Sequence, residues 1–200
     1  MNKQIVKAVF CLAILAISSS AWAFGIGAYA EIGAGNDDII PMGGIMFDTS
    51  VAKNEIFNYR LKLGGGKIIT SKFTKVGLIQ ALGVSPSNIR GNGARFWFGP
   101  RIGIHYVGGE KEVANDNFLT MWFMPVTKKK FDFARFDLGL VLLGFNFNFG
   151  SAATLTFEFG SDYGVYIGDT KKAGMQMSSV EGFANIGFMY RINDVYEEAK

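Results

Sequence analysis

The sequence alternates between apolar and polar residues with a period of two, and this alternation recurs along most of the chain. Between positions 57 and 63 every odd residue is apolar and every even residue is polar: Phe57, Asn58, Tyr59, Arg60, Leu61, Lys62 and Leu63. Successive side chains of a β-strand point to opposite faces, so this period predicts a strand with one apolar and one polar face. A chain built from such segments must fold as a sheet.

The alternation is found in eight segments. They span residues 26–33, 45–51, 57–63, 76–84, 95–106, 131–150, 154–159 and 181–192, of which 76–84 is the least regular. Within 131–150 the apolar parity changes between Leu142 and Phe145, which predicts a β-bulge near Gly144. The 200 residues of the chain, less its first 23, allow about 22 residues for each strand with its connection, enough for a membrane-spanning strand and a loop.

The first 23 residues have the features of a cleavable secretory leader. Lys3 and Lys7 precede an apolar run, and Ala21-Trp22-Ala23 supplies small residues at a cleavage site. Removing them lowers the net charge from +3 to +1, because the leader holds two of the 20 basic residues and none of the 17 acidic ones. A nearly neutral chain lacks the basic footprint of a nucleic-acid-binding protein, so no nucleic-acid partner is expected.

Cysteine and histidine usage limits the chemistry of the mature chain. The only cysteine, Cys11, lies in the leader, and His105 is the only histidine. A thiolate or multi-histidine metal site is therefore excluded, and no metal or cofactor is expected.

The predicted connections alternate in length. Residues 52–55 and 150–152 form tight turns and residues 85–92 a moderate one, whereas 36–42, 109–130 and 168–177 are longer and more charged. The apolar stretch 118–126 either extends a strand or forms a small hairpin. Short turns at one end and long loops at the other, with both termini at the short end, are typical of an outer-membrane barrel. We predict a single antiparallel up-and-down β-barrel of eight strands.

The polar face distinguishes a membrane barrel from a soluble ligand carrier with an apolar interior. A soluble exterior needs dense Lys and Glu, but many of these polar-face positions are glycines: Gly25, Gly27, Gly33, Gly99, Gly103, Gly160 and Gly187. Glycine fits the concave side of a small, tightly curved barrel. The polar face is therefore predicted to point inward and the apolar face toward lipid, with Tyr59, Tyr106 and Tyr190 as candidate interface anchors.

The last strand carries a motif that resembles the C-terminal assembly signal of outer-membrane barrels. Its key positions are Asn185, Gly187, Tyr190 and Ile192, although Ile192 replaces the usual terminal aromatic residue and eight residues follow it. With the leader and the eight segments, the chain resembles the small outer-membrane β-barrel family that includes outer-membrane protein X and the membrane domain of OmpA. The resemblance implies residues 1–23 as signal peptide, 24–192 as barrel and 193–200 as periplasmic tail.

The same resemblance implies a location and partners. We expect a monomer in the bacterial outer membrane, in contact with outer-membrane lipid and lipopolysaccharide, and inserted by the barrel-assembly machinery. Five lysines in the long loops are expected to meet lipopolysaccharide phosphates as point charges, with a solvated loop as the equally weighted alternative. They are Lys128, Lys129, Lys130, Lys171 and Lys172.

Alternation also predicts which charged residues point into the barrel. They are Glu31, Asp48, Arg60, Lys62, Arg95, Arg101, His105, Glu158, Glu181 and Arg191. An eight-stranded barrel is just wide enough to be filled by side chains, and buried charges must be paired, so we expect a plugged interior. A narrow channel along the charges is the alternative.

His105 raises the question of catalysis, because some small outer-membrane barrels modify lipid A with a His and a Ser. The segment His105-Tyr106-Val107-Gly108 has no Ser at the required place, and parity puts His105 inside. No nucleophile within reach of this base can be named, so we predict a non-enzymatic protein. A lipid A-modifying enzyme remains the alternative.

Overall fold

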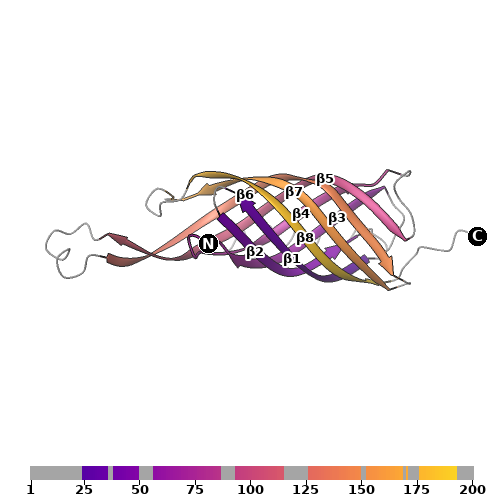
Figure 1. The fold of residues 1–200 in the computed structure, drawn as a ribbon, viewed down its shortest axis with the longest axis horizontal. Coiled ribbons are helices and arrows are strands. Elements are labelled where there is room, and N and C mark those ends of the chain that lie inside the picture. The colour runs from indigo at the N-terminus through magenta and orange to yellow at the C-terminus, as the bar shows by residue number, and fades with distance from the viewer. Residues whose placement is uncertain are drawn as a thin grey trace, which may run out of the picture.

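The structure is a computed structural model that describes residues 24–35, 38–49, 56–86, 93–114, 126–149, 152–168, 170 and 176–192. Eight antiparallel strands pair in sequence order, and β1 closes the barrel on β8 (Figure 1). This confirms the predicted all-β up-and-down barrel. The predicted leader 1–23 and tail 193–200 lie outside the described residues. The strands are β1 (Phe24–Gly35), β2 (Asp38–Asp48), β3 (Phe57–Lys67), β4 (Thr74–Val84), β5 (Ala94–Ala114), β6 (Val126–Phe149), β7 (Ala153–Ile167) and β8 (Ser178–Ile192).

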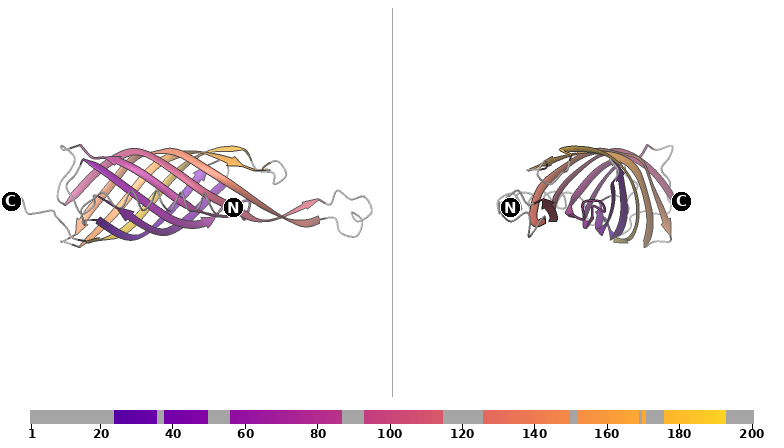
Figure 2. Two further views of the ribbon diagram at one scale, coloured as in Figure 1. Left: turned by 180° about the vertical axis from the view of Figure 1, so that it is seen from behind. Right: turned by 60° about the vertical axis from the view of Figure 1, so that its left-hand side comes forward.

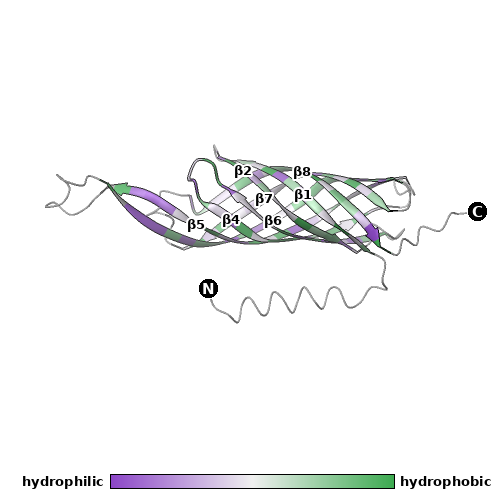
Figure 3. Ribbon diagram, turned by 90° about the horizontal axis from the view of Figure 1, so that it is seen from below, coloured by the Kyte–Doolittle hydropathy of each residue, from purple (hydrophilic) through white to green (hydrophobic). Residues whose placement is uncertain are grey.

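Burial alternates along the strands as the sequence pattern requires. In β8, Glu181 and Met189 are buried inside the barrel, whereas Val180 and Phe188 are more than half exposed on its outer surface. Figure 3 shows the corresponding alternation of hydrophobic and hydrophilic residues along the ribbons. The exterior is therefore apolar and the interior largely polar. Among the described residues there is no helix long and apolar enough to cross a membrane.

Glycines at inward positions make room for the large polar side chains beside them. A Cβ atom on Gly139 would lie 1.9 Å from Asp162 Oδ1, and one on Gly103 would lie 2.6 Å from His105 Nε2. Neither position can carry a larger side chain without displacing its neighbour. Glycine on the concave side of the barrel thus allows the interior to hold bulky charged groups.

The β-bulge predicted near Gly144 is confirmed. The register of β6 against both neighbouring strands shifts by one residue just before Gly144. Leu142 and Leu143 are consecutive, yet their exposed fractions are 63% and 42%, because the extra residue lets both face outward. The bulge restores inward orientation for Asn146 beyond it.

Two predicted loops are wrong in extent. The connection placed at 36–42 is shorter, because Asp38–Met42 already belong to β2 and pair with β1. Asp38 also accepts backbone hydrogen bonds from Ile39 and Thr70, at 3.1 Å and 3.0 Å, which fixes the beginning of this strand.

The loop placed at 109–130 is partly strand. β4 pairs with β5 as far as Gly108, and β7 pairs with β6 from Ala134. Beyond these points, residues 109–114 pair with residues 126–131, and the two segments project from the barrel as a two-stranded ribbon (Figures 1 and 2). We call this segment the outer ribbon, and the barrel end that carries it the ribbon end. The stretch 118–125 lies outside the described residues.

Candidate functional site

The structure places all ten predicted inward charges inside the barrel, each with an exposed fraction of 7% or less. Four further charged side chains, which are not among the predicted ten, lie there as well: Lys75, Arg135, Asp137 and Asp162. Burial of so many charges requires paired partners. The ion pairs among these residues fall into three groups along the barrel axis.

Arg60 organises the group at the end of the barrel where β1 begins and β8 ends. Its guanidinium lies 2.6 Å from Asp48 Oδ2, forms an ion pair with Glu158 across the barrel, and donates to Thr156 Oγ1 at 2.8 Å. Glu158 is also paired with Lys62. These contacts tie β2 and β3 to β7, strands that are not neighbours in the sheet. They therefore cross the interior and do not run along its wall.

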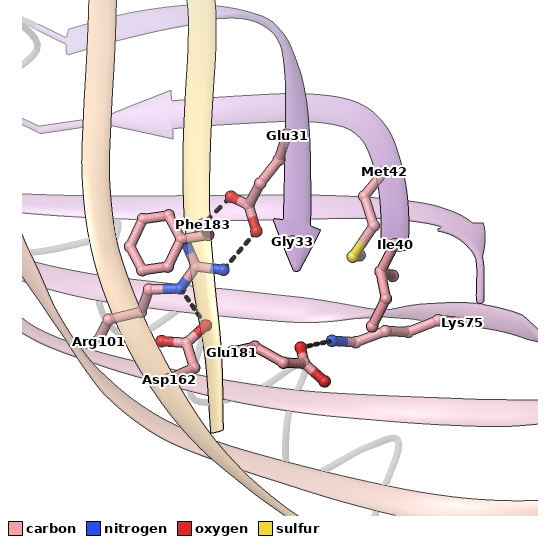
Figure 4. A pocket seen from close by; sticks show the side chains of 9 residues that line it. All are labelled: Glu31, Gly33, Ile40, Met42, Lys75, Arg101, Asp162, Glu181 and Phe183. Carbon is pink, nitrogen blue, oxygen red and sulfur yellow. Dashed lines mark hydrogen bonds and ion pairs between the residues drawn. The ribbon is translucent and has the colours of Figure 1, made fainter. Parts of the chain in front are cut away.

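Arg101 organises the middle group, which Figure 4 shows. Its two Nη atoms lie 3.0 Å and 2.5 Å from the two carboxylate oxygens of Glu31, and its Nε lies 3.1 Å from Asp162 Oδ2. The guanidinium also lies 3.8 Å from the ring centroid of Phe183. One cation thus holds two carboxylates from β1 and β7, and an aromatic ring covers its face.

Asp137 organises the group nearest the ribbon end. Its carboxylate lies 2.6 Å from Arg135 Nε, 3.2 Å from Lys75 Nζ and 2.9 Å from His105 Nε2. Arg135 in turn lies 2.5 Å from Glu181. His105, the candidate base of the enzyme alternative, is therefore held beside an ion-paired carboxylate in the interior.

An apolar cluster covers this third group at the ribbon end. It consists of Ile40, Met42, Ile68, Phe73, Val107, Phe133 and Tyr166, with Phe131 packed against it. Ile68 and Phe73 come from the connection between β3 and β4, and their exposed fractions are 1% and 0%. Lys72 adopts φ 60°, a left-handed conformation that turns the chain immediately before Phe73. We call this set the apolar cap.

A small cavity remains where the middle group meets the cap (Figure 4). Its lining combines carboxylates and cations with apolar groups: Glu31, Gly33, Ile40, Met42, Lys75, Arg101, Asp162, Glu181 and Phe183. Asp162 Oδ1 is buried there without a hydrogen-bond partner among the described residues. A space this small and polar fits ordered water.

Three of the five predicted lysines lie on the outer ribbon. Lys128, Lys129 and Lys130 are exposed in β6, and their register partners on β5 are Glu112, Lys111 and Glu110 in that order. Lys171 and Lys172 lie outside the described residues. The structure therefore brings three of the five predicted lysines together, on strand β6 and not in the predicted loop.

The four residues of the predicted assembly signal lie at the closing seam of the barrel. Asn185 and Gly187 point inward, and Tyr190 is exposed on the outer surface. Ile192 ends β8 opposite Phe24, the first residue of β1. The motif therefore belongs to the strand pair that completes the barrel.

The sequence pattern indicates why the four additional interior charges can also be expected inside the barrel. Asp137 and Arg135 have the parity opposite to Leu138, and Asp162 has the parity opposite to Phe159, so extending each alternation by a few residues would have placed them inside. Lys75 directly precedes the segment 76–84, whose pattern was the least regular. The strands are longer than their strictly alternating cores.

The chain is similar in structure to solved outer-membrane proteins, at low sequence identity. No family model matches the chain, and no curated protein matches its sequence. The solved structure of Neisserial surface protein A is 9% identical, with a TM-score of 0.46, over 86% of this chain and 97% of that one. Outer membrane protein OprG of Pseudomonas aeruginosa is 11% identical, with a TM-score of 0.41, over 86% and 96%.

The strand pairing defines the architecture of this chain directly. Eight strands follow one another around a closed barrel, and the last pairs with the first. The protein therefore has the architecture of the small outer-membrane β-barrels that its sequence resembles.

Proposed function

We propose that the protein is an integral, non-enzymatic barrel of the bacterial outer membrane, exported by its leader and assembled as a monomer with a filled interior. The observation that carries the proposal is the inverted distribution of side chains. Large apolar residues such as Leu138, Ile102 and Ile186 are about half exposed or more, whereas charged residues are buried. This arrangement suits lipid outside and a polar interior within a barrel whose strands leave no open edge.

Heat modifiability tests this proposal. Membrane-inserted barrels resist unfolding by detergent until they are heated, because all strands are hydrogen-bonded around the closed sheet. Unboiled and boiled samples from outer-membrane fractions should therefore migrate differently on gels. Identical migration, or release of the protein by carbonate without detergent, would contradict the proposal.

The surroundings of His105 support the proposal that the protein is not an enzyme. Its imidazole lies beside Asp137, whose carboxylate is shared with Lys75 and Arg135. The apolar cap covers this group, so an acyl chain in the surrounding lipid has no route to it. Mass spectrometry of lipid A incubated with the purified barrel should show no change. Loss or transfer of an acyl chain would instead establish the enzyme alternative.

The exposed lysines support contact with lipopolysaccharide above the apolar band. On the outward side of β5 and β6, Tyr106 and Phe136 are the last aromatic residues before the charged positions of the outer ribbon, and Tyr106 donates a hydrogen bond to Asp132. Lys130 and Lys128 follow on the same side of β6, at the level where lipid phosphates would lie. Lys171 and Lys172 belong to the same proposed contact.

A further inference from the structure

The outward face of β3 and β4 carries a polar contact within the apolar surface. Tyr59 Oη donates a hydrogen bond of 2.8 Å to Gln80 Oε1. The two residues have the same parity as Leu63 and Leu82, which are about half exposed on the outer surface of the same strands. Among the described strands, Gln80 is the only Asn or Gln with outward parity. A carboxamide therefore lies on the surface that we assign to lipid.

Apolar side chains surround Gln80 along the strand and across the sheet. Leu78 and Leu82 flank it on the outward side of β4. Its register partners are Leu61 on β3 and Ile102 on β5. Leu82 and Ile102 are about half exposed, so the surface around the carboxamide is apolar on both sides. Gln80 therefore lies within the apolar band and not at its edge.

The amide nitrogen of Gln80 is the group that needs a partner. A carboxamide has two N–H donors and an oxygen that can accept two hydrogen bonds. The Tyr59 hydroxyl occupies one acceptor position, and neither N–H donor of Gln80 has an acceptor among the described residues. Acyl chains of lipid supply no acceptor, and polar groups inside a membrane are costly unless they are paired. The acceptor at this depth is therefore expected from another protein chain.

We propose that two assembled barrels associate in the membrane through the outward face of β3 and β4, with their Gln80 carboxamides paired across a two-fold axis. Two copies inserted in the same direction carry this carboxamide at the same depth, so each supplies an acceptor where the other needs one. Each Oε1 keeps the Tyr59 hydroxyl and accepts one N–H from the other carboxamide, which fills both of its acceptor positions. A two-fold contact is self-complementary in this way. The inference rests on the proposed membrane location, and each barrel is complete as a monomer before it associates.

Energy transfer between labelled barrels in liposomes tests this contact. The full mature chain with Lys129→Cys on the outer ribbon is labelled with donor or acceptor dye, and transfer is measured as the protein-to-lipid ratio increases. Gln80→Leu replaces the carboxamide with the side chain that already flanks it, so this variant should fold. Ser161→Ala is the control, because Ser161 is a polar residue with outward parity on β7, which is not adjacent to β4.

The two variants should differ from each other. The unmodified barrel should show more energy transfer than randomly distributed monomers. Gln80→Leu should raise the dissociation constant about tenfold, because two hydrogen bonds between the chains are lost, and Ser161→Ala should stay within about twofold. Transfer at the random level in the unmodified barrel, or equal dissociation constants for Gln80→Leu and Ser161→Ala, would overturn the inference.

Cross-linking locates the contact on the barrel surface. Leu78→Cys lies beside the proposed axis and should form a disulfide between two chains on mild oxidation, whereas Leu140→Cys on β6 should not. Equal cross-linking at both positions would contradict a contact through β3 and β4. Heat modifiability is measured on the same liposomes. A barrel that shows it but stays monomeric contradicts the association alone, and its loss would contradict the membrane location as well.

Discussion

Replacing Arg101 with Ala is expected to lower the free energy of unfolding of the barrel by about 3 to 5 kcal/mol. Its guanidinium holds Glu31 and Asp162, from strands that are not adjacent to β5, and all three side chains are at least nine-tenths buried. Removing the cation leaves Asp162 without its charged partner in a place that water reaches poorly. Denaturant midpoints of the refolded barrel in detergent or lipid measure the loss.

Exposed and conservative variants complete this experiment. Lys129→Ala removes a positive charge from the exposed outer ribbon and should cost under about 1 kcal/mol. Arg101→Lys keeps the charge but has one ammonium group for two carboxylates. Its loss of unfolding free energy should therefore lie between the losses of Arg101→Ala and Lys129→Ala. Equal midpoints for Arg101→Ala and Lys129→Ala would show that the interior is hydrated and that its ion pairs are screened.

The second large effect is expected at the apolar cap. Phe73→Ala should destabilise the barrel by about 3 to 5 kcal/mol, because a fully buried ring inside a closed wall leaves a cavity that its neighbours cannot fill. Combined with Ile68→Ala, it should also uncover the ion pairs of Lys75 and Asp137 at the ribbon end. Planar-bilayer recording should then show more current than the unmodified barrel, which we expect to stay nearly closed.

Ile69→Ala is the control for Ile68→Ala, and Phe57→Ala is the control for Phe73→Ala. Ile69 adjoins Ile68 but is 54% exposed, and Phe57 has the same side chain as Phe73 but is 62% exposed on the outer surface. Lipid chains can fill the space left by Phe57→Ala, so no cavity is created and the cost should be smaller. A wide ohmic conductance in the unmodified barrel would contradict the filled interior and favour the channel alternative.

The inward or outward orientation of the strand residues could be predicted from the sequence, because the alternation within one segment defines both faces of that strand. The parity of Arg60 relative to Leu61, or of Glu181 relative to Gly182, is local information, and the structure gives both charged residues the inward orientation that parity predicts. The residues at which the strands end were harder to predict. Lys67 ends β3 beyond the glycines at 64–66, where the apolar signal has already disappeared.

The ion-pair partner of each charged residue inside the barrel could not be predicted from the sequence. Arg60 and Glu158 lie 98 positions apart and meet only because the sheet closes, which also depends on strand tilt and register. The apolar cap was missed for another reason. Its members Val107 and Tyr166 lie beyond the predicted segments 95–106 and 154–159, whereas Phe133 lies within 131–150 on the parity opposite to Leu138. An apolar residue on the polar-face parity was therefore the available signal.

The most direct test of the membrane-embedded barrel is the local environment of its outward face. The predicted mature chain has no cysteine, so single spin-labelled cysteines can be placed at Leu138 and Ile186 on the outer surface and at Lys129 on the outer ribbon. In liposomes, we predict that the first two labels collide mainly with oxygen dissolved in lipid, and the third mainly with a water-soluble nickel complex. If all three labels were equally accessible to the nickel complex, the apolar surface would not contact lipid, and the account of this protein as a membrane barrel would be wrong.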